Sequence, residues 1–161
     1  MIVGFAALSG IDQYAKHRID QKFCTPEEKR NGDDRPLSED ILNGKVKLRK
    51  FYNKGIAFSK FTDHPDTVKK VSIAGTAVIL VYFIIYMFHR EPSGFKWALT
   101  FILSGALSNM IDRVRHGYVI DYFSVNTDKK KKKTLIYNLG DIFIFIGAAI
   151  TVITVLFTSE K

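Results

Sequence analysis

The chain has 161 residues, enough for one domain, and its 24 Lys and Arg against 16 Asp and Glu give a net charge of +8. Such a basic excess is typical of nucleic-acid-binding proteins, but these cations lie between apolar runs without any recognition motif, so we expect no nucleic-acid partner. The single Cys24 excludes an internal disulfide and a cysteine-based metal site. We interpret the cations as charges at the level of the headgroups of membrane lipids.

Segregation of the charged residues predicts an integral-membrane protein. Val71–Phe88 carries no charge over 18 positions and Ile142–Thr158 none over 17. An uncharged helix of that length is roughly 27 Å long, close to the thickness of the hydrocarbon core of a bilayer. We predict one all-α membrane domain over residues 1–161, with four transmembrane helices at about residues 1–19, 68–88, 96–112 and 138–157. The first of these is short for a span, so we expect a few native N-terminal residues to be missing.

Two long loops, at about residues 20–67 and 113–137, connect these helices. The early part of the first loop, Pro26–Asn43, is acidic and contains Gly and Pro, which predicts an irregular segment. Lys45–Arg49 alternates polar and apolar residues, and Tyr118–Phe123 is rich in aromatic and β-branched residues. Both patterns are typical of strands, so we expect a small sheet on the membrane surface.

Two further connections are short or simple in composition. Pro92-Ser93-Gly94 predicts a tight turn that makes the second and third helices antiparallel neighbours. Lys129–Lys133 is a run of five lysines, which predicts a solvated loop, with contact to lipid headgroups as the alternative.

Polar residues in the apolar segments are costly to bury and are therefore candidates for function. Asp12 and Lys16 are four residues apart on one helix face and can form an ion pair, whose role is either structural or functional. Asn53 and Gly55 form an Asn-x-Gly pattern, which is typical of a turn and could also offer an amide to an extended peptide.

The third predicted helix has a face that is small at one end and polar at the other. Gly105, Ser108, Asn109 and Asp112 follow the i, i+3, i+4, i+7 spacing of one helix face. Small residues let membrane helices approach closely, and we expect Asn109, Asp112 and Arg113 to form one hydrogen-bonded group.

Two aspartates lie directly against apolar runs. Asp121 stands inside the second predicted strand, and Asn138 and Asp141 fit the N-cap and N3 positions of the last helix. Two carboxylates placed close together share a proton, so that one can activate a water while the other polarises a carbonyl group. This pattern indicates peptide hydrolysis with no metal and no cofactor. The four histidines show no His-Glu-x-x-His spacing, so a zinc protease is not supported.

Five motifs, in this order along the chain, resemble the lipoprotein signal peptidase (signal peptidase II) family of intramembrane aspartyl proteases. They are Asp12-Gln13-x-x-Lys16, Asn53-x-Gly55-x-Ala57-Phe58, Gly105-Ala106-x-x-Asn109-x-x-Asp112-Arg113, Gly117-Tyr118-Val119-x-Asp121-Tyr122 and Asn138-Leu139-x-Asp141. The resemblance implies cleavage of bacterial prolipoproteins just before a diacylglyceryl-modified cysteine. It also implies four transmembrane helices with a small extracytoplasmic β-sheet and a short surface helix over the site.

The resemblance assigns roles to individual positions. It implies that Asp121 and Asp141 are catalytic and that Asp112 is a supporting aspartate. Asn53 and Arg113 match residues that engage substrate. Residues that shape the site are matched by Asp12, Lys16, Gly105, Asn109 and Asn138, and Gly55 belongs to the Asn53 motif. The departures are Tyr52, Ile56, Ser108 and Gly140, which stand where histidine, alanine, glycine and alanine are common in the family.

The expected location conflicts with the charge pattern. Residues 16–70 and 113–133, the two long loops with the helix ends that flank them, hold 21 of the 24 Lys and Arg residues. The positive-inside rule would place both regions in the cytoplasm. The resemblance implies a bacterial inner-membrane protein with its active site at the extracytoplasmic face, and we follow it. The expected partners are lipidated prolipoproteins and membrane lipids, and the protein is expected to be a monomer. The alternative function is a non-enzymatic four-helix transporter or lipid-binding protein with intramembrane aspartates.

Overall fold

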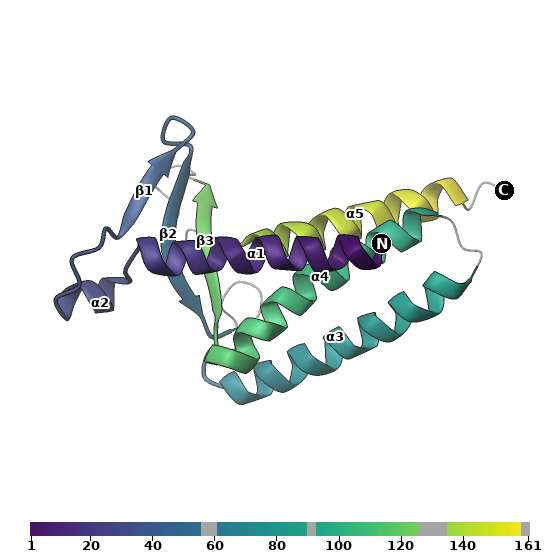
Figure 1. The fold of residues 1–161 in the computed structure, drawn as a ribbon, viewed down its shortest axis with the longest axis horizontal. Helices are drawn as coiled ribbons and strands as arrows, with labels where there is room; N and C mark the ends of the chain where they lie inside the picture. Colours follow the sequence, from purple (N-terminus) through teal and green to yellow (C-terminus); the bar gives the residue numbers. More distant parts are fainter. Residues whose placement is uncertain (56–60, 90–92, 126–134, 159–161) are drawn as a thin grey trace.

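The computed structural model describes residues 1–55, 61–89, 93–125 and 135–158 (Figure 1). Within these ranges the chain is mostly helical, with one small antiparallel sheet. The elements in chain order are α1 (Ile2–Lys22), α2 (Pro26–Arg30), β1 (Ser38–Ile41), β2 (Val46–Asn53), α3 (Pro65–Phe88), α4 (Ser93–His116), β3 (Val119–Val125) and α5 (Leu139–Thr158). Each of the four segments predicted as spans therefore overlaps one of the four long helices, to within one residue at its start where it extends beyond it.

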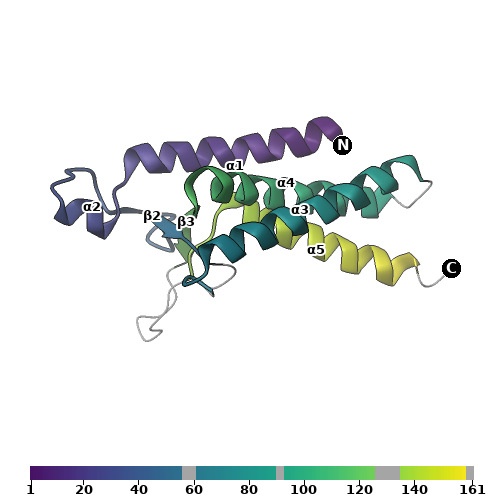
Figure 2. The ribbon, with the colours of Figure 1, turned by 90° about the horizontal axis from the view of Figure 1, so that it is seen from below.

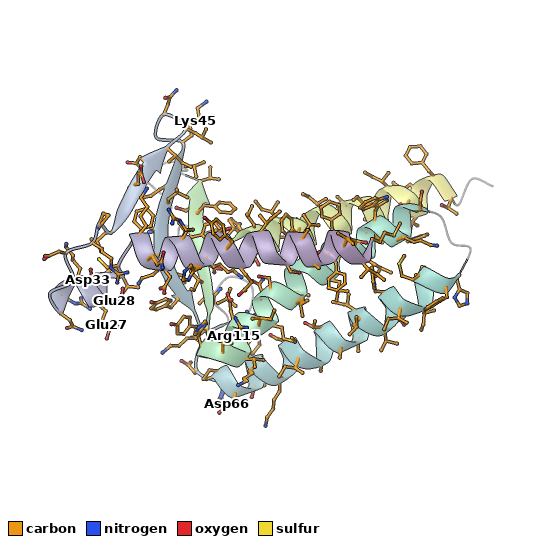
Figure 3. The ribbon with its side chains drawn as sticks, in the orientation of Figure 1. Glu27, Glu28, Asp33, Lys45, Asp66 and Arg115 are labelled. Atoms are coloured by element: carbon orange, nitrogen blue, oxygen red, sulfur yellow. The ribbon has the colours of Figure 1, made fainter. Side chains whose placement is uncertain are left out.

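The long helices α1, α3, α4 and α5 run side by side, and the sheet crosses one end of them (Figures 1 and 2). Helix α4 is central, because it packs against α1, α3 and α5. Helix α1 begins, and α5 ends, at the end opposite to the sheet (Figure 1). The charged side chains labelled in Figure 3, among them Glu28, Lys45 and Arg115, all lie at the sheet end.

Helices α3 and α5 are each long and apolar enough to cross a membrane. Much of their apolar surface is exposed, as at Val81 and Phe145, which is the expected arrangement for side chains that face lipid. Length, composition and exposed apolar surface together are typical of helices in a membrane protein. Helices α1 and α4 are as long as α5 or longer, but they carry charged side chains such as Asp12 and Asp112, which are buried between helices.

The contact between α4 and α5 depends on glycine. A Cβ atom added at Gly105 of α4 would lie 2.0 Å from the carbonyl oxygen of Gly140 in α5. One added at Gly147 would lie 2.6 Å from the carbonyl oxygen of Ala98. These separations are too short for any side chain, so glycine lets the two backbones touch, as small residues do in membrane helix pairs.

The sheet has the order β1-β2-β3, with both pairs antiparallel. In the β2–β3 pair, Leu48 lies opposite Phe123 and Phe51 opposite Asp121, so β2 has one extra residue at Arg49–Lys50 and forms a β-bulge there. The predictions of strands at residues 45–49 and 118–123 are confirmed. The sheet is fixed to α1 by a small apolar core made of Ile19, Phe23, Ile120 and Tyr122.

The prediction that Pro26–Asn43 is irregular was wrong, because this segment contains α2 and β1. Helix α2 begins with a capping box, in which the Thr25 hydroxyl accepts from the Glu28 N–H and the Glu28 carboxylate accepts from the Thr25 N–H. Glu28 also pairs with the buried Lys50 of β2, at 2.8 Å. Residues 26–41 are therefore an ordered extension of the sheet. Lys129–Lys133 and Pro92 lie outside the described residues.

Candidate active site

Asp121 lies in the middle of β3, where a strand buried on both sides carries it into the protein. Its side chain is almost completely buried, with 2% exposed. One carboxylate oxygen accepts a hydrogen bond from Asn53 Nδ2 at 2.9 Å, and the other accepts from Asn138 Nδ2 at 2.7 Å. Burial, and then the negative charge of Asp141, raise the pKa of Asp121 to about 7.

Asp141 lies in the first turn of α5, directly after the sheet. The predicted cap is confirmed, since Asn138 Oδ1 accepts from the Asp141 N–H at 2.9 Å and the Asp141 carboxylate accepts from the Asn138 N–H at 3.2 Å. The other oxygen of Asp141 accepts from Asn109 Nδ2 of α4 at 3.0 Å. A helix N-terminus favours negative charge, so this position suits an ionised carboxylate.

Asn138 connects the two aspartates. Its side-chain amide donates to Asp121 while its carbonyl oxygen and main-chain N–H engage Asp141. The two carboxylates are thus held around one residue by neutral amides, which compensate only part of their charge. Like charges in this situation share a proton, and one acid next to one base is the arrangement that peptide hydrolysis by a bound water requires.

Three consecutive residues attach the start of α5 to β3; we call them the latch, residues 137–139. Tyr137 exchanges main-chain hydrogen bonds with Phe123, and Asn138 donates to Asp121. The N–H of Leu139 donates to the Tyr122 hydroxyl at 3.1 Å. The latch therefore aligns the strand that carries one aspartate with the helix that carries the other.

Lys16 is the centre of a second buried network. Its ammonium group lies 2.8 Å from Asp12 and 2.9 Å from Asp112, and it donates to Asn109 Oδ1 at 2.8 Å. The predicted pair of Asp12 and Lys16 is therefore present, with Asp112 as a second partner. Because Lys16 fixes the carbonyl end of the Asn109 amide, the nitrogen of that amide is directed at Asp141.

The hydrogen-bonded group expected from the sequence is present in part: Arg113 Nη1 donates to the main-chain carbonyl oxygen of Asn109 at 3.5 Å, but Arg113 forms no hydrogen bond with Asp112 among the described residues. Its Nη2 atom donates instead to the carbonyl oxygen of Gly55 at 2.9 Å, and Asp112 accepts from the N–H of Ile120 at 3.3 Å. Asp112 instead forms an ion pair with Lys16 of α1, at 2.9 Å. The Nε atom of Arg113 is buried and has no hydrogen-bond partner within the described part of the chain.

The Asn-x-Gly turn is confirmed. Asn53 Oδ1 accepts from the N–H of Gly55 at 3.0 Å, and this leaves the Asn53 amide nitrogen to donate to Asp121. The turn brings the Gly55 carbonyl to Arg113. The remaining residues of this motif, 56–58, lie outside the described residues.

Sequence reasoning missed three side chains of the site as functional candidates. Gln13 donates to Asp112 at 2.7 Å, and Ser108 donates to Asp12 at 2.6 Å. The Tyr122 hydroxyl, 3.2 Å from Asp12, is the third. Gln13, Ser108 and Tyr122 each stand inside or beside a recognised motif, so their position was the available signal. Within the ranges that the structure describes, no group of three or more His, Cys, Asp or Glu residues is arranged to hold a metal ion.

Solved structures show that the fold is that of bacterial membrane enzymes. One, solved by the in meso method at 2.3 Å resolution, has a TM-score of 0.76 at 24% identity, over 99% of this chain and 90% of that one. Another, solved by the same method at 1.9 Å, has a TM-score of 0.74 at 22% identity, over 96% and 91%.

The family model for signal peptidase (SPase) II matches residues 5–157, nearly the whole chain. A lipoprotein signal peptidase of Mesorhizobium japonicum is 36% identical over 91% of this chain and 79% of that protein. Another from Fusobacterium nucleatum is 29% identical over 98% and 86%. The chain belongs to the signal peptidase II family and is a peptidase. None of these relatives supports the alternative of a non-enzymatic transporter or lipid-binding protein.

Proposed function

We propose that Asp121 and Asp141 are the catalytic pair with which this peptidase removes signal peptides from prolipoproteins. The observation that carries the proposal is the shared partner Asn138, which bonds to both carboxylates. One carboxylate is ionised and takes a proton from the attacking water, while the protonated one donates to the scissile carbonyl oxygen. The raised pKa of Asp121 supports a proton held within the pair near neutral pH.

Substrate is bound beside the pair by Asn53, Gly55 and Arg113. Asn53 and Gly55 form the turn that follows β2, next to Asp121, and Arg113 reaches that turn from α4. An extended peptide that passes this turn meets amide and guanidinium donors. Six further residues shape the site without touching the peptide: Asp12, Lys16, Gly105, Asn109, Asp112 and Asn138.

We further propose that α1, α3, α4 and α5 all span the membrane and that the protein acts as a monomer. At about 1.5 Å per residue even the 20-residue α5 reaches about 30 Å, the thickness of the hydrocarbon core. Asp12, Lys16 and Asp112 support this reading, because these charged side chains of α1 and α4 are buried between helices, as charged side chains within membranes are.

The sheet end is proposed to face outward, against the charge pattern of the loops. Leu42, 68% exposed at the β1–β2 turn, is a suitable site for a cysteine in a background in which the buried Cys24 is replaced by serine. A membrane-impermeant thiol reagent should label Leu42→Cys in intact cells, after the outer membrane is permeabilised where one is present. If Leu42→Cys were labelled only after lysis, the sheet end would face the cytoplasm and the proposed orientation would be wrong.

Cleavage is proposed to occur before a diacylglyceryl-modified cysteine. A site between membrane helices can bury the acyl chains, which contribute about 0.8 kcal/mol per methylene. The experiment is to incubate purified protein with matched precursors that carry or lack the lipid and to follow the shortened product. The lipidated precursor should be cut and the unmodified one cut poorly or not at all. Equal rates on the two precursors would show that cleavage does not depend on the lipid. Absence of product from both precursors would contradict the proposed function.

A further inference from the structure

Tyr122 has no part in the proposed chemistry, yet its hydroxyl joins three elements of the site. The side chain is buried, with 5% exposed. The hydroxyl oxygen accepts from the main-chain N–H of Leu139 in α5, at 3.1 Å, and donates to Asp12 Oδ1 in α1, at 3.2 Å. One oxygen atom on β3 therefore contacts two helices that are far apart in sequence.

The contact to α5 satisfies a group that the helix cannot satisfy itself. Leu139 is the first residue of α5, and N–H groups in the first turn of a helix have no acceptor within that helix. Burial, and then the charge of Asp12, raise the pKa of Tyr122 above its ordinary value, so the hydroxyl keeps its proton. It can therefore donate to Asp12 while accepting from Leu139.

The contact to α1 is rigid because Asp12 is itself fixed. Asp12 is fully buried, and its second oxygen accepts from Ser108 at 2.6 Å and lies 2.8 Å from the Lys16 ammonium. A carboxylate held by α1 and α4 in this way cannot follow a movement of the Tyr122 hydroxyl. The position of the hydroxyl is thus determined by the bundle.

This tether is adjacent to both halves of the proposed active site. Asp121 precedes Tyr122 in β3, and Asn138 precedes Leu139 at the start of α5. We propose that Tyr122 is a positioning residue, whose hydroxyl holds the first turn of α5 against β3 and so keeps Asn138 between the two aspartates. The inference rests on the proposed function, because it matters for cleavage only if Asp121 and Asp141 are the catalytic pair.

The substitution Tyr122→Phe removes the hydroxyl and keeps the ring. Small displacements of reacting groups cost large factors in rate, so kcat for the lipidated precursor should fall about tenfold. KM should stay within about twofold, since the peptide does not contact this hydroxyl. The matched control is Tyr14→Phe, which removes a hydroxyl from a side chain that is 66% exposed on α1. That variant should cleave at the wild-type rate.

A second measurement is hydrogen exchange of the Leu139 amide, first in the wild-type protein and then in Tyr122→Phe. The Leu139 amide of the wild-type protein should exchange its hydrogen slowly in detergent micelles, and exchange at the rate of an open amide would show that the tether is absent. The same amide should exchange faster in Tyr122→Phe, at an unchanged melting temperature. If Tyr122→Phe had an unchanged kcat, or only a raised KM, the inference about Tyr122 would be wrong. Cleavage by the wild-type protein would still support the proposed function in that case. Should Tyr122→Phe not fold, exchange in the wild type decides the matter alone.

Discussion

Two buried polar regions lie side by side at the sheet end of the bundle, and they manage charge in opposite ways. In the first, Lys16 lies between Asp12 and Asp112, so each negative charge has a positive partner within 3 Å. In the second, Asp121 and Asp141 have amide donors from Asn53, Asn109 and Asn138, and none of these carries a charge. Opposite charges hold the first region in one arrangement. In the second, where the donors carry no charge, burial and the charge of Asp141 raise the pKa of Asp121 to about 7.

The comparison predicts that removing ionisation has its largest effect in the second region. Asn is nearly isosteric with Asp but cannot take or give the proton, so Asp121→Asn and Asp141→Asn should each lower kcat by about 10²- to 10⁴-fold. Both variants should remain folded. The measurement is turnover of the lipidated precursor together with a melting temperature. Substantial activity in either variant would show that the substituted aspartate is not a member of the catalytic pair.

Asp112→Asn tests the first region with the same chemical change. It weakens the ion pair with Lys16, which also orients Asn109 towards Asp141, so stability and activity should fall together. A loss of about 1–3 kcal/mol in the free energy of unfolding is expected, with a residual rate of cleavage. If this variant were inactive but fully stable while Asp121→Asn stayed active, the pair would be Asp112 with Asp141.

The packing beneath both regions can be tested with a methyl group. Gly105→Ala places a Cβ atom 2.0 Å from the carbonyl oxygen of Gly140, so the helices must separate, at a cost of about 1–3 kcal/mol. Gly75→Ala on α3 is the matched control, because a Cβ atom there meets nothing within 4 Å. Thermal unfolding of the two variants should differ by several degrees. Equal melting temperatures would contradict the close approach of α4 and α5.

The dependence of kcat on pH tests the difference between the two polar regions without a substitution at Asp121 or Asp141. A raised pKa means that Asp121 keeps its proton up to about pH 7, where an exposed aspartate is ionised. Above that pH both members of the pair become charged, so kcat should decline as the pH rises through about 7. Turnover measured from pH 5 to pH 9 provides the check. A rate that increases through pH 7 would exclude the singly protonated pair as the active form.

Local contacts of the site could be predicted from the sequence, and distant ones could not. The pair of Asp12 and Lys16 and the cap formed by Asn138 and Asp141 follow from spacings of four and three residues. The contact of Tyr122 with Asp12 joins residues 110 positions apart, and no periodicity encodes it. The same holds for Arg113 with Gly55, 58 positions apart, where the sequence suggested the neighbouring Asp112 instead.

The long helices and two of the three strands were predictable because their patterns are continuous. Helix α2 and strand β1 were missed although the Thr25-Pro26-Glu27-Glu28 run carries a capping-box signal. Its Gly, Pro and acidic neighbours favoured an irregular interpretation. What orders this segment is tertiary, namely the contact of Glu28 with Lys50, 22 residues further along the chain.

The latch at residues 137–139 makes the relative position of the two aspartates depend on hydrogen bonds between β3 and the start of α5. The site is therefore assembled by docking a helix end onto a strand. A change that breaks this contact would separate Asp121 from Asp141 even while the strand and the helix each stay folded.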